Sequence, residues 1–128
     1  MGNITIKQSP VSFLLNILGK KWTFEILDAL LVEEMQFSEI ERRYPDLSGK
    51  MLSRRVNELF DLGLIGKAIS RIQPLEFKYR ITEKGKMLKR LFYELSVTGT
   101  KLFRQEILEN PNVDTSEIEA YFKQMYLE

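Results

Sequence analysis

One short segment, residues 48–61, combines the side chains best suited to bind another molecule. Its apolar residues recur with the period of a helix and define a predicted inner stripe of Leu52, Val56, Leu59 and Phe60. The polar residues fall on the opposite face and its flanks: Lys50, Ser53, Arg54, Arg55, Asn57 and Glu58. Arginine can bind guanine through two hydrogen bonds, and asparagine can bind adenine in the same way. We therefore predict base contacts from Ser53, Arg54 and Asn57.

Lys50 and Arg55 lie nearer the start and the flank of this predicted helix, where phosphates of DNA are the more natural partners. Lys20 and Lys21 begin another predicted helix and would add phosphate contacts through their charge and the helix dipole. Ser38 is a further candidate for a phosphate contact. The alternative is that all these polar side chains form ordinary solvated surface.

A β-hairpin is predicted directly after the helix. Gly63 ends the helix, and two strands follow at Leu64–Ile72 and Glu76–Thr82, joined through Gln73-Pro74-Leu75. The order of helix, tight glycine turn and hairpin is typical of a winged helix-turn-helix, which places a helix in the DNA major groove and a hairpin beside it.

Four cations on this hairpin would supply contacts to a phosphate backbone: Lys67, Arg71, Lys78 and Arg80. Period-two spacing predicts that Lys67 and Arg71 share a face, and that Lys78 and Arg80 share a face. Glu76 near the turn opposes this positive charge.

Helices are predicted on both sides of this segment. After a polar arm at residues 1–8, Ser9 is the predicted N-cap of a helix that starts at Pro10 and ends at Gly19. The next elements are a helix at residues 21–31 with Trp22 inward and a minimal strand at residues 36–37. Ser38 is then the predicted N-cap of a short helix that ends at Arg43, with Glu41 at the capping-box position. Thr82 is the predicted cap of one long helix over residues 83–108, and Asp114 caps a final helix.

The predicted fold class is mainly α with a small β-hairpin (α+β), as one domain of 128 residues. Within it, residues 1–18 form an arm and a first dimerisation helix, residues 19–82 the winged helix-turn-helix, and residues 83–128 the C-terminal helices. The outer helices are too apolar for a domain of this size to cover. We therefore predict a homodimer, with an interface that includes Phe13, Ile17, Leu95, Leu102, Phe103 and Phe122. A helical hairpin that closes on its own core is the alternative.

Composition narrows the function further. The chain has no Cys and no His, so it lacks the thiol nucleophile, the commonest general base and the usual soft metal ligands. No metal site, cofactor or catalytic residue is expected. No apolar run approaches the roughly 20 residues that span a bilayer, and no signal peptide is predicted, so we expect a cytoplasmic protein without a membrane partner.

Charge is unevenly distributed along the chain. Residues 1–90 hold 16 Lys and Arg against 11 Asp and Glu, whereas residues 91–128 hold 3 against 7. A basic body with an acidic C-terminal part fits one region that faces DNA and another that faces elsewhere. Chance asymmetry on a solvated surface is the alternative.

The chain as a whole resembles the HxlR-type winged-helix transcription regulators, relatives of the MarR group. The matching stretches are Pro10-Val11, Leu18-Gly19-Lys20-Lys21-Trp22-Thr23, Phe37-Ser38-Glu39-Ile40, Ser48–Val56, Glu58-Leu59, Leu62-Gly63-Leu64-Ile65 and Tyr79-Arg80-Ile81-Thr82-Glu83-Lys84-Gly85. The resemblance covers about residues 9–103. It implies a homodimer paired through its terminal helices that binds a palindromic operator and represses or activates nearby genes. It also implies that Ser48–Asp61 is the recognition helix and that the wing is about Lys67–Arg80.

Two departures from the family pattern stand out. Many members carry a Cys just before the Pro-Val pair, and several use it to sense oxidants or electrophiles, but this chain has Ser9 there. Because a hydroxyl cannot follow the oxidation chemistry of a thiol, cysteine-based redox sensing is not expected. Members often have a basic residue where Glu76 stands and an acidic one where Lys78 stands, so the wing charge is displaced.

Other function classes fit less well. A winged helix can also serve as a protein–protein interaction module, but a docking face would be expected to carry more aromatic residues than Lys50, Arg54 and Arg55 provide. An enzyme is disfavoured because no Gly-rich phosphate loop is present. A small-molecule effector is left open, since nothing in the sequence marks a pocket for one.

Overall fold

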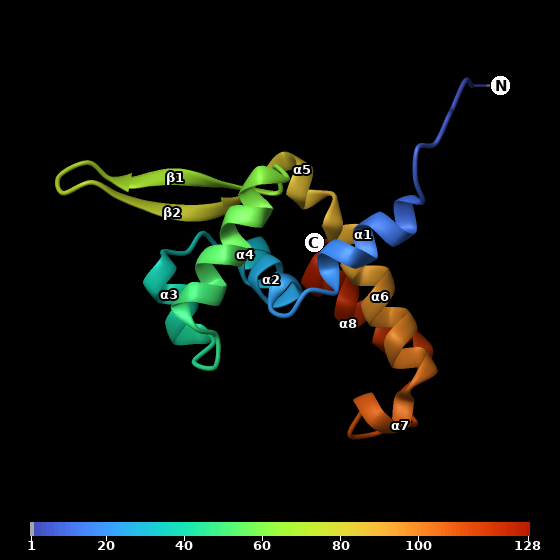
Figure 1. Cartoon of the computed structure of the whole chain (residues 1–128). Coiled ribbons are helices and arrows are strands. Elements are labelled where there is room, and N and C mark those ends of the chain that lie inside the picture. The colour runs from blue at the N-terminus through green and yellow to red at the C-terminus, as the bar shows by residue number, and fades with distance from the viewer. Residues whose placement is uncertain (1) are drawn as a thin grey trace. The chain divides into compact units, whose positions relative to one another are not determined.

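The computed structural model describes residues 2–128 and contains the elements expected of a winged helix-turn-helix (Figure 1). In chain order they are α1 (Pro10–Leu18), α2 (Thr23–Val32), α3 (Phe37–Arg43), α4 (Gly49–Asp61), β1 (Ile65–Arg71), β2 (Glu76–Ile81), α5 (Glu83–Lys86), α6 (Leu88–Leu102), α7 (Arg104–Ile107) and α8 (Thr115–Tyr126). The chain divides into two compact units, one ending at Thr82 and the other starting at Glu83. Within residues 2–128, no helix combines the length and apolarity needed to cross a membrane.

The core of the first unit is built on α2, α4 and the base of the hairpin. Leu52, Val56 and Leu59 of α4 are all at most 2% exposed, which confirms three positions of the predicted inner stripe. Phe60 was predicted to complete that stripe, but it is 48% exposed and lies on the flank of the helix. The other buried apolar residues of this unit are Ile26, Leu27, Ala29, Leu30, Met35, Ile40, Leu47, Leu64, Ile65, Tyr79 and Ile81.

Two helices start differently from the prediction. The N-cap of α3 is Gln36 rather than Ser38, and the Glu39 side chain accepts a hydrogen bond from the Gln36 amide (2.9 Å). The strand predicted at residues 36–37 is replaced by an isolated β-bridge between Met35 and Tyr79 of β2. Because this bridge lies one residue earlier than predicted, the helix can begin at Phe37. Ser38 therefore lies in the first turn of α3, with an exposed side chain.

The start of α2 is set by Trp22, whose φ of 76° places it in the left-handed region and delays the helix to Thr23. The Trp22 ring is only half-buried and lies against the Tyr44 ring, with 5.8 Å between centroids. The Tyr44 hydroxyl donates a hydrogen bond to the Glu25 carbonyl (3.0 Å), which connects the end of α3 to α2.

The predicted glycine stop after α4 is confirmed. Gly63 has a φ of 75°, a conformation that costs an L side chain roughly 1–2 kcal/mol. Its carbonyl accepts a hydrogen bond from the Thr82 hydroxyl (2.6 Å), so the two ends of the hairpin meet at this turn. β1 and β2 pair antiparallel, with Ile65 opposite Ile81 and Lys67 opposite Tyr79, and the register shifts between Ile69 and Arg71.

The prediction of a single long helix over residues 83–108 is wrong, because this segment is divided into α5, α6 and α7. The second break is at Phe103, where φ is −125° and ψ is 51°. The neighbouring Arg104 guanidinium donates hydrogen bonds to the carbonyls of Pro111 and Val113 and to the Thr115 hydroxyl (3.2, 2.5 and 2.9 Å). These contacts hold the chain reversal between α7 and α8, whose N-cap is Asp114 as predicted.

In the second unit, α6 packs against α8 within the same chain. The Phe92 and Tyr126 rings meet edge to face with 6.0 Å between centroids, and Lys101 Nζ lies 3.1 Å from Glu119 Oε1. This packing leaves a set of large apolar side chains about half to two-thirds exposed: Leu95, Leu102, Phe103, Ile107, Tyr121 and Met125.

We expect Gly63→Ala to lower the free energy of unfolding by about 1 kcal/mol, because the added Cβ disfavours a positive φ. Gly99→Ala is the matched control. Gly99 lies inside α6, a Cβ there would meet no heavy atom within 4 Å, and alanine favours a helix, so stability should rise by about 0.5 kcal/mol. Chemical denaturation of both variants gives the two values. An unchanged midpoint for Gly63→Ala would contradict the role assigned to this turn.

Candidate nucleic-acid interface

The outward face of α4 presents a set of polar side chains next to one another. The helix begins at Ser48, whose hydroxyl accepts a hydrogen bond from the Met51 amide (3.1 Å). Lys50, Ser53, Arg54 and Asn57 are all exposed, and each lies on the side away from the buried stripe. None of these four makes an ion pair or a side-chain hydrogen bond to another residue in the described part of the chain. The predicted base-contact residues thus lie together on an open surface.

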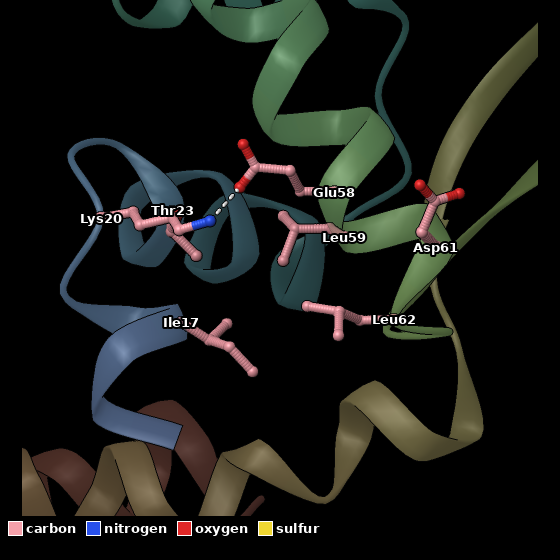
Figure 2. Close-up of a pocket in the computed structure, with 7 residues that line it drawn as sticks. All are labelled: Ile17, Lys20, Thr23, Glu58, Leu59, Asp61 and Leu62. Atoms are coloured by element: carbon pink, nitrogen blue, oxygen red, sulfur yellow. Dashed lines mark hydrogen bonds and ion pairs between the residues drawn. The ribbon is translucent and has the colours of Figure 1, made fainter. Parts of the chain in front are cut away.

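A small cavity lies behind the C-terminal half of α4 (Figure 2). Its volume is about 300 Å³, and Ile17, Leu59 and Leu62 point toward one another across it. One side is closed by an ion pair between Lys20 Nζ and Glu58 Oε2 at 2.8 Å. The Asp61 carboxylate points away from these side chains. The cavity separates the start of α2 from the end of α4, and the ion pair bridges that gap.

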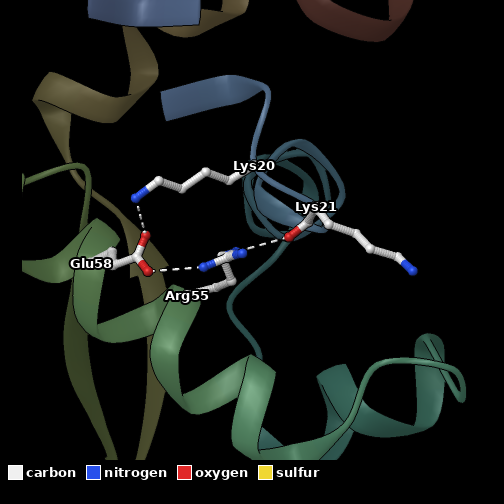
Figure 3. Close-up of polar contacts among 4 residues, drawn as sticks. All are labelled: Lys20, Lys21, Arg55 and Glu58. Carbon is white, nitrogen blue, oxygen red and sulfur yellow. Dashed lines mark hydrogen bonds and ion pairs between the residues drawn. The ribbon is translucent and has the colours of Figure 1, made fainter. Parts of the chain in front are cut away.

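Glu58 joins α4 to the residues just before α2 (Figure 3). Besides its ion pair with Lys20, its Oε1 accepts a hydrogen bond from Arg55 Nη1 (2.9 Å). Arg55 Nε in turn donates to the Lys21 carbonyl (2.8 Å), and the Arg55 side chain is only 11% exposed. We call Lys20, the Lys21 carbonyl, Arg55 and Glu58 the α2–α4 clamp.

The clamp engages Arg55 and Lys20, two of the residues that were predicted to contact phosphates. Arg55 is held inside the protein by two hydrogen bonds, and the Lys20 ammonium is paired with Glu58. Lys21 differs, because its side chain points away from the clamp and lies near the Trp22 ring, 5.9 Å from the centroid. Lys21 and Lys50 are therefore the more accessible cations near α4.

The sequence predicts Glu58 on the outward polar face of α4 and indicates no role for it. The hydrogen bond from Lys20 lowers the pKa of the Glu58 carboxyl, and the charge and hydrogen bond of Arg55 lower it further against the opposing effect of burial. The carboxylate is consequently ionised over the neutral range. The only signal in the sequence was the spacing of three residues between Arg55 and Glu58, which is common on solvated helices.

The wing cations do not share one face. Lys67 pairs with Tyr79 in the β-ladder, whereas Lys78 pairs with Ala68 and Arg80 with Gly66, so Lys67 lies on the opposite side of the hairpin from the other two. Lys67 Nζ lies over the Phe77 and Phe60 rings, 4.6 and 5.7 Å from their centroids.

Charge near the wing turn is largely paired. Arg71 Nη1 lies 3.5 Å from Glu76 Oε1, and Gln36 Nε2 donates to Glu76 Oε2 (3.3 Å). The register shift between Ile69 and Arg71 separates Arg71 from the simple alternation that the sequence predicted. Lys67, Arg71 and Arg80 are exposed and Lys78 is half-exposed, so all four wing cations reach solvent, and Lys78 and Arg80 share a face.

The predicted interface residues lie at several places in the two units. Phe13, Leu95, Leu102 and Phe103 are exposed, with values of 46%, 49%, 68% and 54%. Ile17 is half-buried and lines the cavity behind α4, and Phe122 is half-buried with its ring against that of Tyr121 (5.0 Å between centroids). Among residues 2–128, no group of three or more acidic side chains comes together in a way that could hold a metal ion.

Comparison with known proteins agrees with this architecture. The model of the HxlR-like helix-turn-helix family matches residues 17–107. The uncharacterised HTH-type transcriptional regulator YvaP of Bacillus subtilis is 35% identical over 94 residues, which are 73% of this chain and 87% of YvaP. The reduced form of the transcriptional regulator YodB from B. subtilis superposes with a TM-score of 0.68 at 28% identity, over 73% of this chain and 93% of that one. A protein described as a MarR-family transcriptional regulator from Porphyromonas gingivalis W83 gives a TM-score of 0.65 at 26% identity, over 84% of this chain and all of that one.

We expect Glu58→Gln to lower the free energy of unfolding by about 1 kcal/mol at pH 7, because Arg55 loses its charged partner in a partly exposed network. The pKa of Glu58 is lowered by folding, so its contribution is present above the unfolded pKa and disappears as pH falls through the folded value. The stability difference between wild type and variant should therefore shrink toward zero below about pH 4. Denaturation at several pH values measures it, and a difference independent of pH would contradict the clamp.

Proposed function

The chain belongs to the HxlR-like helix-turn-helix family of transcriptional regulators, and we propose that it binds a specific palindromic DNA operator as a homodimer. The observation that carries this proposal is the outward face of α4, where Lys50, Ser53, Arg54 and Asn57 are exposed on a helix whose other face is firmly buried. A helix of this kind fits the major groove, where each base pair presents its own pattern of donors and acceptors.

In this proposal α4 is the recognition helix. Arg54 binds a guanine through two hydrogen bonds, Asn57 binds an adenine, and Ser53 contacts a neighbouring base edge. Lys50, Lys21 and Ser38 contact phosphates and thereby fix the position of the helix along the duplex.

We assign a different role to the two cations of the clamp. Arg55 and Lys20 hold the recognition helix against the start of α2 through Glu58, so they act as positioning residues. The geometry of α4 is then preorganised before DNA arrives, and binding needs less reorganisation. Along the wing, Arg80 and Lys78 share one face and form no ion pair in the described part of the chain, and we propose that they contact the phosphate backbone.

The homodimer follows from the apolar surface outside the winged helix. A palindromic operator requires two recognition helices related by a two-fold axis, about 34 Å apart. Each unit has exposed apolar side chains that a second copy would cover: Phe13 on α1 in the first unit, and Leu95, Leu102 and Phe103 in the second. Half-buried Ile17 and Phe122 complete the proposed interface.

The proposed regulator does not sense oxidants through a thiol. The chain has no Cys, and Ser9 is the N-cap of α1 through a hydrogen bond from the Ser12 amide (3.2 Å). The solved relative YodB is described in a reduced form. Because this chain has no Cys, its regulation would not use the oxidation of a cysteine. We also propose that the protein acts in the cytoplasm, without a cofactor and without catalysis.

We expect Arg54→Ala to cost about 1–3 kcal/mol of operator affinity and to relax specificity at one base pair of each half-site. Operators are first selected from a random duplex pool, and both proteins are then titrated against single-base variants. Arg90→Ala is the matched control, because Arg90 is exposed on α6 and pairs with Glu94 far from α4 in sequence. Equal weakening on all sequences would remove the assigned base contact, and failure of the wild type to select any duplex would overturn the proposed function.

We expect the double variant Leu102→Asp/Phe103→Asp to dissociate the dimer, since it places two charges on the proposed apolar interface. Sedimentation velocity should show a dimer for the wild type and a monomer for the variant at micromolar concentration. Glu106→Gln changes an exposed charge on the neighbouring helix and should leave the dimer intact. A monomeric wild type would contradict the homodimer.

A further inference from the structure

A second cavity lies in the unit that starts at Glu83 and is lined by residues of α6, α7 and α8. Its volume is about 460 Å³, within the range of about 300–1,000 Å³ that is usual for small-molecule sites. Thr100 and Ile118 are each 3% exposed and form its inner side, while Ile107 and Tyr121 are 59% and 62% exposed and line its opening. We call this cavity the α6–α8 pocket. An open and mostly apolar hollow of this size has room for a small organic molecule.

The wall of the pocket between α7 and α8 is held in place by Arg104. Its guanidinium donates hydrogen bonds to the carbonyls of Pro111 and Val113 and to the Thr115 hydroxyl. Val113, together with Leu108, lines the pocket. Because contacts within the chain fix this wall, ligand binding would need little reorganisation.

The polar and aromatic side chains of the lining favour a positive charge. Glu117 is exposed at the pocket, and within residues 2–128 no cation is paired with its carboxylate. The Tyr121 and Phe122 rings also line the pocket and meet edge to face, with 5.0 Å between centroids. The faces of aromatic rings attract an ammonium group, and a carboxylate attracts it through its charge. The lining thus combines two kinds of group that recognise an organic cation.

The cations of this part of the chain leave the negative charge at the pocket in excess. Residues 91–128 hold 3 Lys and Arg against 7 Asp and Glu. Lys101 is paired with Glu119 at 3.1 Å, and the Arg104 guanidinium is taken up by carbonyls and a hydroxyl. Lys123, the third cation, is exposed on α8 and does not line the pocket. The local charge therefore favours a cationic ligand over an anionic one.

We propose that the α6–α8 pocket binds a small organic cation, in which an ammonium group is attached to an aromatic or branched apolar body. The body would lie against Leu108, Val113 and Ile118, and the ammonium would lie beside Glu117 and the aromatic rings. Because α8 lies beyond residues 17–107, which the family model matches, the site is not contained in the matched segment. The inference goes beyond the proposed function and does not depend on it.

A second copy of the chain is the other candidate occupant of the pocket. The proposed dimer surface on α6 is formed by Leu95 and Leu102, which are 49% and 68% exposed, whereas Thr100 of the same helix lines the pocket. At about 100° per residue, Thr100 lies about 140° around the helix from Leu95 and about 160° from Leu102. A partner that covers Leu95 and Leu102 would therefore leave the pocket open, with Phe122 shared by the pocket and the proposed interface.

The experiment titrates the full-length wild type, without DNA, with phenethylamine and with phenethyl alcohol, its neutral counterpart of similar shape. We expect the amine to bind about tenfold more tightly in isothermal titration calorimetry, because only the ammonium interacts with the carboxylate and the aromatic rings through its charge. In methyl NMR spectra, the largest shifts should fall on Leu108, Val113 and Ile118.

Two variants separate the contributions of charge and ring. Glu117→Gln should weaken phenethylamine binding about fivefold and Tyr121→Leu about threefold, and both should leave the affinity for phenethyl alcohol nearly unchanged. Both side chains are exposed, so the variants should keep the melting temperature of the wild type. Glu106→Gln is the matched control, because it removes an exposed carboxylate of α7 that does not line the pocket, and it should bind both probes as the wild type does.

Equal affinity of the wild type for the amine and the alcohol would overturn the proposal, and so would an equal effect of Glu117→Gln and Glu106→Gln. Absence of binding by the wild type would also overturn it, including the case in which a second copy covers the pocket. NMR shifts confined to residues outside the pocket would assign the cation to another site and overturn it as well. Because no DNA is present, these results are independent of DNA binding by α4, and failure of the proposed function would leave this test unaffected.

Discussion

The burial of one face of α4 is the constraint on which the rest of this molecule depends. Leu52, Val56 and Leu59 are almost completely inaccessible, so the helix has one rotational setting about its axis. A rotation by a single residue, about 100°, would bring Ser53 and Asn57 into the positions of Leu52 and Val56 at a large desolvation cost. The outward presentation of the basic face is therefore a consequence of core packing, and it requires no contact of its own.

The α2–α4 clamp adds a polar constraint to this apolar one. Packing fixes the rotation of α4, and the contacts of Glu58 and Arg55 connect the same helix to the residues before α2. The carboxylate stays ionised because two cations stabilise its charge, and Arg55 tolerates burial because a carboxylate and a carbonyl take up its donors. Two side chains that looked like ligand-binding cations in the sequence thus contribute to the position of the helix that carries the others.

Prediction from the sequence succeeded where the signal was local. The glycine stop at Gly63, the N-cap at Ser48 and the paired strands after them each depend on residues within a few positions, and all three are present. The prediction failed where contacts between residues far apart in the chain set the boundaries of a helix. The start of α3 depends on the bridge between Met35 and Tyr79. The end of α6 lies next to Arg104, whose side chain forms hydrogen bonds with residues 111–115.

By itself the sequence determined the order of the elements as far as the hairpin, three of the four inner positions of α4 and the family to which the chain is similar, because periodicity, caps and glycine turns are encoded in short stretches. Only the tertiary structure decided which charges have a close partner within the chain. Lys20, Arg55, Lys67 and Arg71 are engaged by Glu58, Phe77 or Glu76, while Lys50, Arg54 and Arg80 are exposed without such partners in the described chain. The physical reason is that the energy with which a charge can interact with another molecule depends on the groups within a few ångströms of it, and most of those groups are distant in sequence.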